Sequence, residues 1–204
     1  DVDRFRNPCI EPAACRCAAC DQDFDSHARN IPLHVYSSRR GLIDGSCVER
    51  HCSRCGLYFM GHWRYRRQGS NGVVTDMRMT HNPMDEDIFL SFSGPKAHSI
   101  VGMFVTARRR ASAVLHHARG SFTAVGEIMV EESRCPRMEA MQANSHLKDR
   151  VIIRLWVVCA LAEFLTWRTT SDIDWAPWLA ECRSAADAWL YTQKTEVRTR
   201  FVQK

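Results

Sequence analysis

Two C-x2-C pairs constrain this chain more than any other feature of its sequence. Cys17 and Cys20 form the first pair, Cys52 and Cys55 form the second, and 31 residues separate the two. Each pair presents two sulfur atoms from one tight bend, and four thiolates at ~2.3 Å satisfy a tetrahedral zinc ion. The pattern therefore predicts one Zn²⁺ site. A redox dithiol is disfavoured, because neither pair follows a strand and opens a helix.

The rest of the chain favours metal binding over disulfides as the role of these cysteines. The N-terminus lacks the apolar region of a signal peptide. Arg154 and Glu163 interrupt the most apolar run, 151–165, which is also too short to span a bilayer. We therefore expect a reducing compartment and no membrane partner. Because the chain starts at Asp1 and stops without a terminal cap, we also expect it to be part of a longer polypeptide with further domains.

Three further cysteines and a histidine leave a second metal site open. Cys9, Cys15, Cys47 and His51 lie near the four predicted ligands in sequence and could form this site, with His27, His34 or Cys135 as other donors. The alternative is that Cys47 packs on a strand and that His51 lies at the surface. Cys159 lies on an apolar helical face and is expected in the core.

The pattern predicts strands around the cysteine pairs and helices after them. Strands are expected at 33–38, 46–52 and 56–67 with a turn at 39–45, and 97–102 could pair with a strand over 84–94. Helical spacing predicts helices over 99–120, 121–133, 144–168 and 171–201. The expected fold class is α+β, with a zinc-ribbon-like small β-sheet in 1–95 and a helical region of about four helices in 96–204.

Basic and aromatic residues alternate directly after the second cysteine pair. The formal net charge is +5, and only four of the 28 basic residues are lysines. Arginines interleaved with aromatic rings suit a nucleic-acid backbone and its base faces. The candidate nucleic-acid contacts are Trp63, Arg64, Tyr65, Arg66 and Arg67. The alternative is a solvated strand edge, where charge discourages aggregation.

No catalytic constellation is recognised in the sequence. A Walker-type phosphate loop and a G-x-S-x-G nucleophile elbow are both missing. Four thiolate ligands would leave a zinc ion no open position for substrate water, so the predicted metal is structural. A third alternative is a metal-dependent nuclease using Asp85, Asp87 and a histidine such as His81.

The order of these motifs resembles a known family. "CAAC", "LHVYSSRRGLIDGSCVERHCSRCGLYF", "HARGSFTAVGEIM" and "LKDRVIIRLWVVCALAEFL" together look like the CxC-type cysteine-cluster domains associated with Kyakuja-Dileera-Zisupton transposases. The resemblance covers roughly 17–165. It implies that Cys17, Cys20, Cys52 and Cys55 bind zinc, and that the protein is a nuclear, transposase-related DNA or chromatin binder. A zinc-stabilised module for protein–protein assembly, without nucleic-acid binding, is the alternative.

Overall fold

The part of the chain that the structure describes is mostly β-sheet. The structure is a computed structural model. It describes residues 7–37, 41–83, 86–92, 100–104, 107, 109, 112–113, 124–125, 155–159, 162–163 and 171–177. The strands are β1 (Cys9–Ile10), β2 (Arg29–Ser37), β3 (Gly41–Cys52), β4 (Leu57–Met60), β5 (Trp63–Gln68), β6 (Val73–Met79), β7 (Ile88–Phe92) and β8 (Ile100–Phe104).

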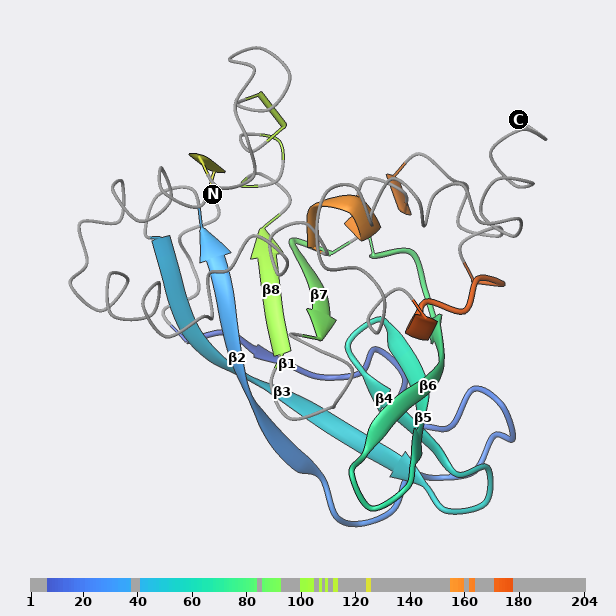
Figure 1. The fold of residues 1–204 in the computed structure, drawn as a ribbon. Coiled ribbons are helices and arrows are strands. Elements are labelled where there is room, and N and C mark those ends of the chain that lie inside the picture. Colours follow the sequence, from blue (N-terminus) through green and yellow to red (C-terminus); the bar gives the residue numbers. More distant parts are fainter. Residues whose placement is uncertain are drawn as a thin grey trace.

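All eight strands belong to one curled sheet that resembles half of a barrel (Figure 1). Along the sheet the order is β6-β5-β4-β3-β2-β8-β7, and β1 pairs with β3 off this path. Residues 41–49 of β3 pair with β2, whereas residues 50–52 pair with β4. Since one long strand takes part in both halves, the sheet bends along β3 and brings the β4–β6 meander under the β2–β8–β7 part.

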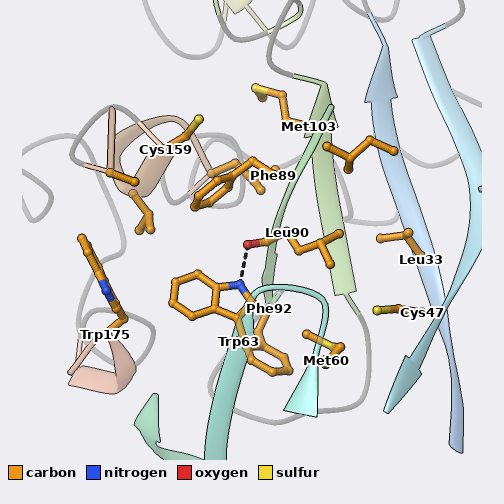
Figure 2. Close-up of a cluster of buried hydrophobic side chains, with 14 of the residues drawn as sticks. Leu33, Cys47, Met60, Trp63, Phe89, Leu90, Phe92, Met103, Cys159 and Trp175 are labelled. Carbon is orange, nitrogen blue, oxygen red and sulfur yellow. Dashed lines mark hydrogen bonds between the residues drawn. The ribbon is translucent and has the colours of Figure 1, made fainter. Parts of the chain in front are cut away.

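Apolar side chains from both halves of the sheet meet in one large core (Figure 2). Trp63, Phe89 and Leu90 are fully buried there. The indole Nε1 of Trp63 donates a hydrogen bond to the carbonyl of Leu90 at 2.7 Å, which satisfies the only polar atom of that side chain. The described helical residues 155–159 contribute Cys159 to the same core, as expected from its apolar face. Cross-sheet packing of this kind fixes how the meander sits against the rest.

The predicted helical region is wrong. The structure is mostly β, and the longest run of helical residues that it describes after 104 is 155–159, where about four long helices were expected. Residues 100–104 fall in the first predicted helix but form β8, parallel to β2 and antiparallel to β7. Ile100 and Val101 are β-branched and fit a strand, and pairing on both sides satisfies the strand's backbone polar groups, which overrides the helical spacing. Other parts of the predicted helices lie outside the described residues.

The strands near the cysteine pairs differ from the expectation in two places. β3 already begins at Gly41, inside the predicted turn, because its pairing with β2 runs without a break from Ser37↔Gly41 to Arg29↔Glu49. The predicted strand 56–67 is two strands, β4 and β5, separated by a turn at Gly61 and His62. The predicted pairing of 84–94 with 97–102 is found between β7 and β8.

A segment distant in sequence covers the outer strand of the meander. The Trp175 amide donates to the Met77 carbonyl at 2.8 Å, and the Met77 amide donates to Oδ1 of Asp174 at 2.9 Å. The Trp175 ring is buried beside Trp63, with ring centroids 6.4 Å apart. The segment 171–177 therefore occupies hydrogen-bonding positions that an open edge would leave free. Within the described residues, no helix has the length and apolar content needed to cross a bilayer.

Candidate metal centre

The four cysteines of the two C-x2-C pairs come together, as predicted. Their sulfur atoms all lie within 4.8 Å of one another. The Sγ of Cys17 is 3.9 Å from that of Cys55, and the Sγ of Cys20 is 3.6 Å from that of Cys52. These distances exclude disulfides, and they agree with the ~3.8 Å between thiolates that bind one ion tetrahedrally at ~2.3 Å. The cluster could hold one metal ion.

The two cysteine bends share one backbone geometry. In the first, the Asp21 amide donates to the Cys17 carbonyl at 2.8 Å; in the second, the Gly56 amide donates to the Cys52 carbonyl at 2.8 Å. The donor residue has a positive φ in both, 56° at Asp21 and 62° at Gly56. Aspartate and glycine are among the residues that tolerate this conformation, so each sequence closes its bend directly after the second cysteine.

A small apolar cluster surrounds the sulfur atoms. Cys17 and Cys52 are buried, and Leu57 and Phe59 of β4 pack with them. Phe24 lies against Phe59 with a centroid distance of 5.1 Å. This cluster is separate from the large core of the sheet. The N-terminal cysteine bend therefore packs few apolar side chains of its own, and it meets the sheet through the sulfur cluster and through the hydrogen bonds of Asp25 with His51 and Ser53.

The donor set fits a thiophilic metal ion. Hydrogen bonding to Cys55 lowers the pKa of Cys20 to about 7, which favours a thiolate near neutral pH. Hydrogen bonding to Cys20 raises the pKa of Cys55 to about 12, so further deprotonation there is unfavourable without a cation. A metal ion that binds all four sulfur atoms would replace these protons.

The residues of the second candidate metal site do not gather. The described residues contain no other group of three or more cysteine, histidine, aspartate or glutamate side chains at ligand distances. Cys9 and Cys15 are exposed, whereas Cys47 is buried in the large core. Nδ1 of His51 is 2.5 Å from a carboxylate oxygen of Asp25, and its ring lies against Tyr58. Cys135 lies outside the described residues.

The two aromatic candidates for base stacking point into the protein. Trp63 and Tyr65 are both fully buried. The burial pattern along β5 alternates, as the period of two in a strand requires, and places these rings on the core face. The hydroxyl of Tyr65 donates to the carboxylate of Glu49, which is itself buried. Neither ring is accessible to a nucleic-acid base in this fold.

The three arginine candidates have different surroundings. Arg67 donates to the buried Glu49 carboxylate and lies over the Tyr58 ring. Arg66 is half exposed and donates from Nη1 to the Cys55 carbonyl at 2.8 Å. Arg64 is half-buried on β5 and pairs across the sheet with Phe59 and Arg78. The basic stretch therefore does not form one continuous exposed surface.

Sequence reasoning missed a second cluster of ionisable side chains. The Glu86 carboxylate lies 3.0 Å from Nδ1 of the fully buried His62 and 2.6 Å from Nε2 of His81. His81 was a nuclease candidate, but here its partners are Glu86 and Thr80. Asp87 lines a pocket of about 300 Å³ between β1 and residues 86–88, and Asp85 lies outside the described residues. The separation of 24 residues between His62 and Glu86 gave no local signal.

The four-cysteine centre is thus the site on which sequence and structure agree. The likeness to cysteine-cluster domains rests on the order of motifs in this chain alone. No family model, no curated protein and no solved structure matches the chain.

Proposed function

We propose that this chain is an interaction module whose fold is held together by one structural Zn²⁺ ion. The observation that carries the proposal is the convergence of four cysteine sulfur atoms, and no other donor type, within 4.8 Å. Four thiolates favour zinc among the abundant divalent ions and leave no coordination position open for chemistry. The ion would fasten residues 16–25 to the end of β3 and the start of β4.

For the partner, the geometry supports the protein–protein alternative better than the DNA reader. Trp63 and Tyr65 are buried, and Arg67 is paired with Glu49, so three of the five expected nucleic-acid contacts are used inside the fold. An assembly module needs none of these side chains. Transposase association, a chromatin partner and nuclear location are proposals that depend on the family resemblance alone.

Elemental analysis of the purified full chain tests the metal. We expect one zinc per polypeptide in the wild type, and near-complete loss in Cys52→Ala and in Cys17→Ala. Cys9→Ser removes an exposed thiol outside the cluster and is the matched control, which should keep one zinc. Iron in place of zinc, or full metal content in Cys52→Ala, would contradict the proposal.

Fluorescence anisotropy with labelled duplex and single-stranded DNA tests the partner class. We expect no binding at ~50 mM salt beyond weak non-specific association. Tight binding that weakens steeply between ~50 and ~200 mM salt would restore the DNA reader, because release of counterions from phosphates has that signature. In that case Arg64→Met and Arg66→Met should reduce the salt dependence.

A further inference from the structure

The two cysteine bends differ in the residues that hold them in place. The first bend is held by its own flanks, through the Cys17 amide on the Gln22 carbonyl at 2.8 Å and a bridge between Arg16 and Asp23. The second bend receives contacts from elsewhere in the chain. The Ser53 amide donates to Asp25, and the Cys55 carbonyl accepts from Arg66. Arg66 therefore links the second bend to β5 through a hydrogen bond.

The guanidinium group of Arg66 packs closely over the residue that follows the second ligand pair. A Cβ at position 56 would lie 3.4 Å from Nη1 of Arg66. That distance is an ordinary van der Waals contact, so the φ of 62° is what favours glycine at position 56. The hydrogen bond from Nη1 of Arg66 to the Cys55 carbonyl, at 2.8 Å, places a positive charge against the backbone of that cysteine.

An irregularity in the sheet directs Arg66 to this position. The pairing of β5 with β6 shifts between Arg64 and Arg66, so β6 has an extra residue there. Asp76 lies in this bulge with φ of 46°, and its carboxylate is 3.8 Å from Nε of Arg66. Bulges re-aim side chains locally. Here the bulge places a carboxylate beside the arginine that binds the Cys55 carbonyl.

We propose that Arg66 is a positioning residue for the metal centre, and this inference rests on the zinc site proposed above. Its hydrogen bond fixes the carbonyl of Cys55 and thereby the orientation of the Cys52–Cys55 bend. Its positive charge also favours the metal-bound form, because Zn²⁺ with four thiolates has a formal charge of about −2. Arg66 acts from outside the ligand set, as supporting residues of metal sites commonly do.

Chelator competition on the full chain tests this role. Arg66→Met keeps the apolar stem and removes both the donor and the charge. We expect it to weaken zinc binding about tenfold, within the range seen when supporting residues of metal sites are removed. Arg66→Lys keeps a charge and one donor and should recover part of the affinity. Arg64→Met, two residues away on the same strand, is the matched control and should bind zinc like the wild type.

Cobalt substitution distinguishes positioning of the metal ligands from a general effect on packing, because the visible absorption of Co²⁺ reports on its ligand geometry. With Co²⁺ as probe, we expect Arg66→Met to shift the visible absorption bands, since the Cys55 sulfur changes orientation. The unfolding midpoint of the metal-free chain should stay within error of the wild type. Unchanged zinc affinity and spectrum in Arg66→Met, or an equal loss in Arg64→Met, would overturn the role of Arg66 and leave the zinc site standing. A wild type without zinc would overturn both.

Discussion

At the scale of single residues, a buried carboxylate explains why two residues of the basic and aromatic stretch, Tyr65 and Arg67, point into the fold. Glu49 is 3% exposed, and both Tyr65 and Arg67 donate hydrogen bonds to it. An ionised carboxylate in a core is costly unless it has a countercharge and hydrogen-bond donors. Arg67 supplies the countercharge, and both Arg67 and Tyr65 supply hydrogen bonds. These two residues of the basic and aromatic stretch therefore have a role in stabilising the fold.

This assignment predicts different costs for the two donors. Arg67→Met should lower the free energy of unfolding by about 3 kcal/mol, because it leaves Glu49 buried without a countercharge. Tyr65→Phe should cost about 1–2 kcal/mol, the loss of one hydrogen bond to a charged acceptor. Urea unfolding of the metal-loaded chain measures both. Equal costs, or a smaller one for Arg67→Met, would contradict the role given to Glu49.

A second carboxylate, the half-buried Glu86, makes stability depend on pH. Burial alone would raise the pKa of Glu86, but hydrogen bonds from His62 and His81 outweigh it and lower that pKa to about 2. Burial lowers the pKa of His62, so its ring stays neutral in the fold. Both folded-state pKa values lie below the unfolded ones. The stability from His62 is therefore present above pH ~6.5 and declines below it, and that from Glu86 is present above pH ~4.5.

Replacing Glu86 by glutamine tests the lower window. At pH 7, Glu86→Gln should lower the free energy of unfolding by roughly 2–3 kcal/mol, and this difference from the wild type should shrink as the pH falls from about 4.5 toward 2. Asp87→Asn changes the neighbouring exposed carboxylate and should show a much smaller difference. Urea unfolding between pH 7 and pH 3 follows both variants. A pH-independent difference would contradict the role given to the hydrogen bonds of Glu86 with His62 and His81.

At the scale of elements, the segment 171–177 completes the sheet where β6 would otherwise be an edge. One aspartate organises the contact: Oδ1 of Asp174 accepts from the amides of Met77 and Ala176, at 2.9 and 3.0 Å. This acceptor turns the chain so that the Trp175 ring enters the core. The contact joins residues almost one hundred positions apart, so a pattern within one segment of the sequence does not predict it.

Removing this acceptor should loosen the segment without unfolding the sheet. We expect Asp174→Ala to cost about 1–2 kcal/mol and to speed hydrogen exchange of the Met77 amide. Asp174→Asn keeps an oxygen at Oδ1 and should stay close to the wild type. Hydrogen exchange measured by mass spectrometry resolves the difference. Unchanged protection of β6 in Asp174→Ala would mean that Trp175 alone holds the segment.

At the scale of the whole molecule, the described structure has two separate apolar clusters, and each stabilises a different part of it. The large core joins both halves of the sheet, whereas the small cluster consists of the cysteine bends, Leu57, Phe59 and Phe24. The small cluster buries little apolar area, so the metal is expected to contribute most of its stability.

Chelation should therefore act locally. On removal of zinc we expect fast hydrogen exchange at residues 16–25 and 51–57, and continued protection of β2, β7 and β8, which border the large core. Far-ultraviolet circular dichroism should change little. Loss of protection across the entire sheet would show that the metal stabilises both clusters. Unchanged protection at 16–25 would show that the metal is not needed to hold this segment.

The amino-acid sequence by itself identified the four cysteines that could hold a metal ion. A C-x2-C bend is a local structure, so its spacing and the residue after it, Asp21 or Gly56, suffice to present two sulfur atoms. Only the tertiary structure decided between strand and helix at 100–104, where the sequence pattern offered both, and showed that Trp63 and Tyr65 face inward. It also placed His62 beside Glu86 and Asp174 beside Met77. Strand pairing and burial depend on contacts between distant residues, and a periodic pattern within one segment does not contain them.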